Sequence, residues 1–150
     1  MKKILFFAMA LVAGALAFTS CNPNKVDSPI VGTWRYQTPP APDSGWFGVY
    51  IFTFNGDGTF ALYDYAYGPE ADLSKPYDGF VWRGPYEIND DIITIHKDKY
   101  GIAKADGTEE YDDEWQPEDE KLKFSINGNI MHITRDYGTD YSWDADYTKQ

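Results

Sequence analysis

The sequence predicts an all-β protein, an antiparallel sandwich or barrel of about eight short strands. No segment after residue 21 shows a long helical period of apolar residues. Short runs of apolar and aromatic residues recur instead at intervals of about 8–12 residues, as in all-β domains. Turns rich in Asn, Asp and Gly at residues 55–58, 89–91 and 127–129 separate pairs of these runs and predict hairpins.

In the first half of the domain we predict three strands, at residues 30–36, 46–54 and 59–67. The proline-rich segment 38–45 is predicted as a loop because prolines and an Asp-Ser-Gly run punctuate it. The second strand carries aromatic residues at even positions, Tyr50, Phe52 and Phe54. Alternate residues of a strand share a face, so these three rings are expected to point inward.

In the second half we predict strands at residues 80–88, 92–97, 121–126, 130–135 and 141–149. Pro85 lies inside the first of them and indicates an edge or a bulge there, because proline cannot donate to a ladder. Residues 68–79 are predicted as a long loop with room for a helical turn. Residues 99–120 are small and polar and then strongly acidic, and we predict a mobile loop for this stretch.

The N-terminus has the layout of a secretory signal, with Lys2 and Lys3 followed by an apolar run. That run, Ile4–Phe18, is shorter than the about 20 residues that a spanning helix needs. Cys21, the only cysteine, follows two small residues, and the site resembles a bacterial lipobox with Phe18 in place of the usual leucine. We therefore predict a cleaved signal peptide over residues 1–20, lipidation of Cys21, and a tether over residues 21–29.

The net charge of the chain and its predicted export limit the classes of partner that it can bind. A formal net charge of −11 argues against nucleic acid, whose phosphates must be neutralised by Lys and Arg. The resemblance to lipoproteins implies a lipid anchor in the envelope of a Gram-negative bacterium, most simply at the outer membrane. With its single cysteine lipidated, the domain has no internal disulfide and depends on packing. We expect a monomer.

Four stretches of the domain resemble the bacterial lipocalin-like family, small lipid-anchored proteins related in shape to the calycins. They are the Gly-x-Trp opening at 31–34, the hairpins at 52–60 and 84–95, and the segment 124–133. The resemblance implies an up-and-down barrel over residues 30–150, shorter than a full lipocalin. In lipocalins a late-strand arginine covers the opening tryptophan. The resemblance thus also implies a cation–π pair between Arg135 and Trp34, contributing about 0.5–2 kcal/mol.

Aromatic residues are the candidates for a ligand site in such a barrel: Trp34, Tyr50, Phe52, Phe54, Tyr65, Trp82 and Tyr86. The alternative is that these rings fill the interior, because an eight-stranded barrel is just wide enough for side chains. Tyr63, Tyr65 and Tyr67 share one face of their strand, either as a stacking surface or as an outward decoration.

We expect a lipid-anchored protein that binds a small apolar or amphipathic ligand, with no catalysis, cofactor or metal. No nucleophile elbow or phosphate-cradling loop is present in the sequence, and His96 and His132 are interpreted as structural. The alternative is a protein–protein module, such as an inhibitor of an exported hydrolase or an accessory subunit of an envelope complex. The acidic chain would then dock a basic partner.

Overall fold

A computed structural model describes residues 28–73, 77–136 and 142–150. Within these ranges the chain forms ten strands and no helix: β1 (Gly32–Gln37), β2 (Phe47–Phe54), β3 (Thr59–Tyr67), β4 (Gly79–Asn89), β5 (Ile92–Lys97), β6 (Lys99–Ala103), β7 (Glu109–Tyr111), β8 (Glu118–Asn127), β9 (Ile130–Asp136) and β10 (Ser142–Lys149). None of the described segments is a helix of the length and apolarity needed to cross a bilayer.

Eight of the strands close into an antiparallel barrel in the order β1-β2-β3-β4-β5-β8-β9-β10, and β10 pairs back with β1. Neighbours around the barrel are neighbours in the chain apart from the excursion through β6 and β7. The predicted all-β, up-and-down barrel is therefore confirmed. The hairpin turns at residues 55–58, 89–91 and 127–129 join β2–β3, β4–β5 and β8–β9 as predicted.

The prediction of a mobile loop over residues 99–120 is wrong. β6 pairs with residues 79–83 of β4, β7 pairs with β6, and β8 begins within the same stretch. Trp115, between β7 and β8, is also fixed, because its indole Nε1 donates to the Lys97 carbonyl at 2.8 Å. Acidic residues have low β-propensity, but the acidic residues of β7 and of the start of β8 pair with the neighbouring strands β6 and β5.

A break in the ladder at Pro85 divides the barrel into two ends. On the side away from β3, β4 pairs with β5 through residues 86–89 and with β6 through residues 79–83. Gly84 is required at the break, since a Cβ there would lie 1.8 Å from the His96 carbonyl oxygen. Residues 84–85 of β4 lie opposite residues 96–98, so a bulge is present at the predicted place, with the extra residue on the β5–β6 side. We call the β5 side of the break the closed end and the β6 side the open end.

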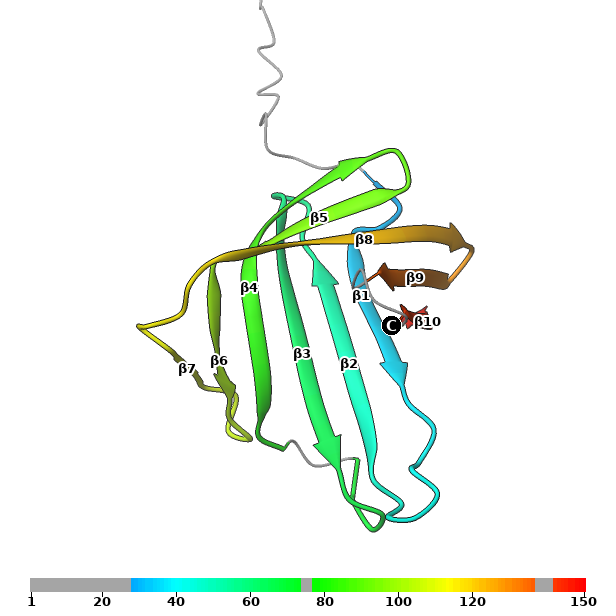
Figure 1. Cartoon of the computed structure of the whole chain (residues 1–150), viewed down its shortest axis with the longest axis vertical. Coiled ribbons are helices and arrows are strands. Elements are labelled where there is room, and N and C mark those ends of the chain that lie inside the picture. The colour runs from blue at the N-terminus through cyan, green and yellow to red at the C-terminus, as the bar shows by residue number, and fades with distance from the viewer. Residues whose placement is uncertain (1–27, 74–76, 137–141) are drawn as a thin grey trace, which may run out of the picture.

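The two ends differ in how far the wall extends. Figure 1 shows β8 crossing in front of the upper parts of β1–β4, while their lower parts continue beyond it. At the closed end, β8 continues the wall from β5 to β9. At the open end, the sheet stops at β7, which pairs with β6 alone. The inner face of β1–β4 and β6 is therefore a concave surface at the open end.

Side chains fill the closed end. Trp34, Phe52, Phe54 and Phe60 are fully buried there with aliphatic residues of β5, β8 and β9. The Trp34 indole donates to the Ile30 carbonyl at 2.6 Å, so the segment that enters β1 is held at this end. The inward direction predicted for the even positions of β2 is confirmed, and buried side chains occupy the interior of the closed end.

Candidate functional site

A cavity of about 650 Å³ lies at the open end. This volume falls within the range of small-molecule sites, about 300–1,000 Å³. Its walls come from the β1–β2 connection and from the inner faces of β2, β3, β4 and β6. The lining residues that carry the argument below are Trp46, Tyr50, Asp64, Phe80, Ile102 and Lys104.

The register of the strands explains where the cavity lies. One row of side chains runs across four strands, with Tyr50 facing Asp64, Asp64 facing Phe80, and Phe80 facing Ile102. The next row toward the rim contains Gly48 opposite Ala66, both of which line the cavity. Because these two residues are small, the concave face is hollow beside the row of Asp64.

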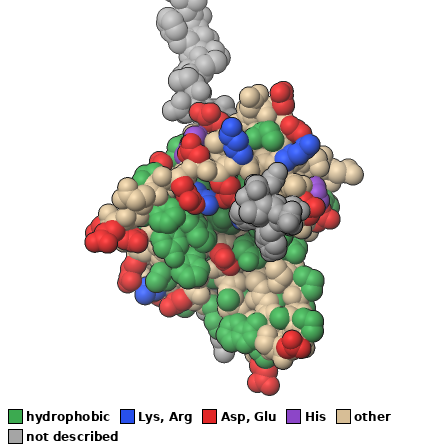
Figure 2. Space-filling model, viewed as in Figure 1, with side chains coloured by type: hydrophobic (Ala, Val, Ile, Leu, Met, Phe, Trp, Pro, Cys, Tyr) green, Lys and Arg blue, Asp and Glu red, His purple; other side chains and the backbone are tan. Residues whose placement is uncertain are grey.

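Apolar side chains are exposed in this hollow. Trp46 is 54% exposed, Phe80 47% and Ile102 39%, although all three are large and hydrophobic. Figure 2 shows hydrophobic side chains gathered on the viewed face over β4 and β6. Contiguous exposed apolar surface of this kind marks binding sites more often than free surface.

Asp64 is the carboxylate at the centre of the concave face. Its neighbours in the inward phase of β3 are the buried Phe60 and Leu62, so a charge occupies a position that continues the core face. Burial raises the pKa of the Asp64 carboxyl, and the positive charge of Arg135 opposes that rise. Among the described residues, the Asp64 side chain makes no hydrogen bond and no ion pair.

Two further charged groups on the cavity wall, Lys104 and Asp78, have polar partners. The Lys104 ammonium lies 3.1 Å from the Glu110 carboxylate. Asp78 accepts a hydrogen bond of 2.7 Å from the backbone N–H of Ala105. Both contacts hold the turn after β6 at the rim of the cavity.

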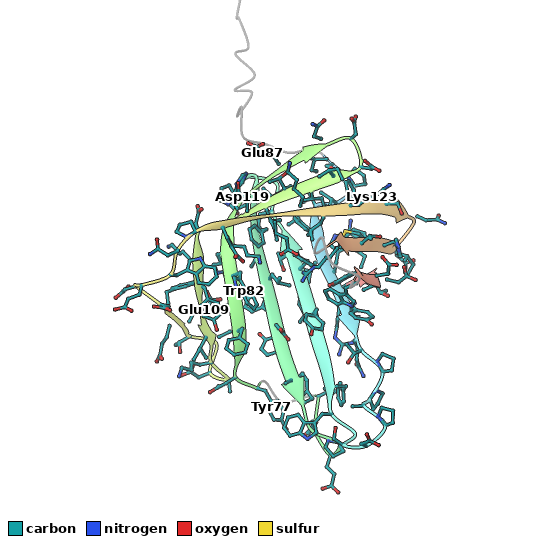
Figure 3. The ribbon with its side chains drawn as sticks, in the orientation of Figure 1. Tyr77, Trp82, Glu87, Glu109, Asp119 and Lys123 are labelled. Carbon is teal, nitrogen blue, oxygen red and sulfur yellow. The ribbon has the colours of Figure 1, made fainter. Side chains whose placement is uncertain are left out.

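Two groups of aromatic rings flank the position of Asp64. On the β1–β2 side, the Tyr36 and Trp143 rings lie 6.2 and 5.0 Å from the Tyr50 ring. On the β4–β6 side, the Trp82 and Tyr100 rings lie 6.2 and 5.8 Å from the Phe80 ring. Trp82 lies on β4 just below the crossing strand β8 (Figure 3).

A chain of ion pairs connects β5, β8 and β9. Lys97 lies 2.7 Å from Glu118 and 2.9 Å from Glu120, and Glu120 lies 3.3 Å from the Arg135 Nε. Two cations and two carboxylates alternate along this chain, so it is neutral overall. We refer to Glu118, Lys97, Glu120 and Arg135 as the ion chain.

The predicted pair of Arg135 with Trp34 is replaced by two other pairs. Arg135 lies 4.5 Å from the Trp143 ring, its direct partner in the β9–β10 ladder. The cation over Trp34 is Lys149, at 5.1 Å, its partner in the β1–β10 ladder. The register of β10 thus decides both pairs.

The outer face of the β3–β4–β7 wall has a polar cluster. Glu109 accepts hydrogen bonds from the Arg83 guanidinium at 2.7 and 2.8 Å, from Tyr63 at 2.9 Å and from Tyr111. These donors, Arg83 first, lower the pKa of Glu109 to about 2, and burial raises that of Tyr63 to about 12. The cluster attaches β7 to β3 and β4 and so fixes the β6 wall of the cavity.

The sequence-predicted site residues divide into three groups. Trp34, Phe52, Phe54 and Tyr86 are buried core residues of the closed end. Tyr50 lines the cavity, and Trp82 lies in the adjacent row. Tyr65 lies on the outer face, where its ring is stacked on Tyr63 at 6.0 Å. Cys21 lies outside the described residues.

Sequence reasoning missed Asp64, Phe80, Ile102 and Trp46. A signal for Asp64 was present, because it follows Phe60 and Leu62 at the period of two. No local signal joins Phe80 to Ile102, since their contact depends on β6 being a strand.

No protein-family model, curated protein or solved structure matches the chain. The fold and the cavity define a small antiparallel β-barrel that is filled at one end and hollow at the other. Membership of the lipocalin-like family stays a prediction from the motifs.

Proposed function

We propose that the protein binds a small amphipathic ligand in the open-end cavity and acts by binding rather than by catalysis. The observation that supports this proposal is the exposure of Trp46, Phe80 and Ile102 around a cavity of about 650 Å³. Burying such surface under a ligand gains about 25 cal/mol per Å² of apolar area. The site lies at the barrel mouth and not among the core rings.

A titration of small amphipathic compounds with matched variants tests this proposal. Ile102→Ser removes exposed apolar surface inside the cavity, and Leu73→Ser removes a comparably exposed side chain that does not line it. We expect the first variant to weaken binding at least several-fold and the second to leave it unchanged. Native mass spectra of gently purified protein add a direct search for co-purifying ligand. Equal binding by both variants would contradict the proposed site.

Lipid anchoring at Cys21 and residence in the outer envelope belong to the same proposal. The segment 28–31 lies at the closed end, because Ile30 is buried there and Lys149 donates to the Pro29 carbonyl at 3.3 Å. A chain attached through Cys21 would therefore enter the domain at the end opposite the cavity. Metabolic labelling with a fatty-acid analogue should label the wild type and not Cys21→Ser.

A protein partner of basic charge remains the alternative. The net charge of −11 supports this alternative, but no contact among the described residues identifies a surface where such a partner would dock. Binding of a basic envelope enzyme that survives Ile102→Ser would favour this alternative over a small ligand.

A further inference from the structure

We infer that the ligand of the open-end cavity is an organic cation, whose ammonium group lies beside Asp64 while its apolar body covers Phe80, Ile102 and Trp46. This inference rests on the proposed binding function and names the chemical class of the ligand.

The first argument is the charge balance around Asp64. The ion chain neutralises itself, since Lys97 and Arg135 are matched by Glu118 and Glu120. The other cation on the wall, Lys104, is matched by Glu110. Asp64 therefore adds one negative charge to a cavity whose neighbouring cations already have carboxylate partners.

The second argument is the environment of that charge. Asp64 is half-buried, and its cross-strand neighbours are Tyr50 on β2 and Phe80 on β4. A carboxylate among rings loses hydration that only a hydrogen-bonding or charged partner restores. An ammonium group in the cavity would supply both, and no described side chain does so by direct contact.

The third argument is that the same rings suit a cation. Side chains directly opposite in an antiparallel pair have Cβ atoms about 4.5–5.5 Å apart, so Tyr50 and Phe80 are adjacent to Asp64. Cations are attracted to ring faces within about 6 Å of the centroid. The ion chain already contains a cation–π contact, because the Arg135 guanidinium lies 4.5 Å from the centre of the Trp143 ring.

The same charges disfavour other ligands. A fatty acid or a phosphate would place its anion near Asp64 and Asp78, inside a chain of net charge −11. A metal ion would need several oxygen or nitrogen ligands, and the described residues contain no group of three or more His, Cys, Asp or Glu arranged to hold one. An ammonium ion with an aryl or alkyl body fits both the charge and the apolar wall.

A series of probes with one aryl-alkyl body and head groups of different charge tests the inference. The probes are 4-phenylbutylammonium, 4-phenylbutanol and 4-phenylbutanoate, titrated calorimetrically into the purified full chain. We expect the cation to bind at least about tenfold more tightly than the alcohol. The carboxylate should bind most weakly of the three.

Two isosteric variants separate a local charge effect from a global one. Asp64→Asn and Asp144→Asn remove the same charge, the first from the cavity and the second from an exposed position on β10. We expect Asp64→Asn to abolish the preference for the cation and Asp144→Asn to retain it. Near-ultraviolet circular dichroism checks that both variants are folded.

The outcomes distinguish the two proposals. If the alcohol binds, Ile102→Ser weakens it, and the cation has no advantage, the binding function stands and the ammonium inference is overturned. If Asp64→Asn leaves the preference for the cation intact, the inference is likewise overturned. If no probe binds, both the inference and the proposed site are contradicted.

Discussion

Asp64 and Phe80 are direct cross-strand partners in the β3–β4 pair, so a half-buried carboxylate stands beside a phenyl ring that is 47% exposed. A protein selected for stability alone would bury the ring and expose the acid. The reverse arrangement persists only where another requirement outweighs the cost, and binding sites are the usual place for such a departure.

Asp64→Asn should stabilise the free protein at neutral pH. The folded pKa of Asp64 is raised by burial, so the ionised form is disfavoured by the fold and its contribution becomes less unfavourable as pH falls. Removing the charge should raise the free energy of unfolding by about 1 kcal/mol or less at pH 7. Urea unfolding from pH 7 down to 3 measures this gain, which should shrink toward low pH. A loss of stability at pH 7 would show that Asp64 is a structural ion-pair partner.

Glu109→Gln should destabilise the protein with the opposite pH dependence. The folded pKa of Glu109 is about 2, below its ordinary value of 4.5, so its stabilising contribution is complete above pH 4.5 and is lost as pH falls toward 2. We expect a loss of about 1–3 kcal/mol at pH 7, the scale of hydrogen bonds to charged groups.

The measurement for Glu109 is the difference in unfolding free energy between wild type and variant across this pH range. Glu87→Gln, at an exposed position of β4 (Figure 3), is the control and should change stability by less than about 0.5 kcal/mol. A difference that persists unchanged at pH 2 would show that the effect is not due to the charge.

Ala66→Phe should fill the cavity without unfolding the barrel. Ala66 is exposed on the inner face of β3 and lines the cavity opposite Gly48, so a phenyl ring there occupies the ligand's space. We expect loss of ligand binding with a stability change within about 0.5 kcal/mol. Thr148→Phe adds the same ring at an exposed position of β10 and should leave binding intact. Retained binding by Ala66→Phe would place the ligand elsewhere.

The sequence predicted the closed end better than the open end, for a physical reason. Phe52 and Phe54 obey a period of two, and the hairpin turns fix their partners locally, so strand alternation alone places them in the core. The cavity depends on the pairing of β4 with β6, which joins Phe80 to Ile102 through a strand of five residues, one of them a glycine. That short segment is a strand because it pairs with β4 and β7, and local patterns do not contain this information.

The pairs formed by Trp34 and Arg135 illustrate the same limit. The resemblance supplied the right residue types, a buried opening tryptophan and a late arginine. Which cation meets which ring depends on the register of β10, where Trp34 faces Lys149 and Arg135 faces Trp143. Register across strands distant in the chain follows from the whole barrel and not from a motif.

Gly84→Ala should test whether the break in β4 is what divides the barrel into two ends. The added Cβ would lie 1.8 Å from the His96 carbonyl oxygen, which is backbone and has no free space to retreat into. Either β4 separates from the β5–β6 junction or the junction shifts, so we expect a loss of at least about 2 kcal/mol in unfolding free energy. Gly68→Ala is the matched control, because its nearest neighbour would be a Trp46 ring carbon at 3.7 Å, an ordinary contact. If Gly84→Ala were as stable as Gly68→Ala, the chain would accommodate a side chain at the break. The close approach of β4 to the β5–β6 junction would then not be what separates the filled end from the hollow one.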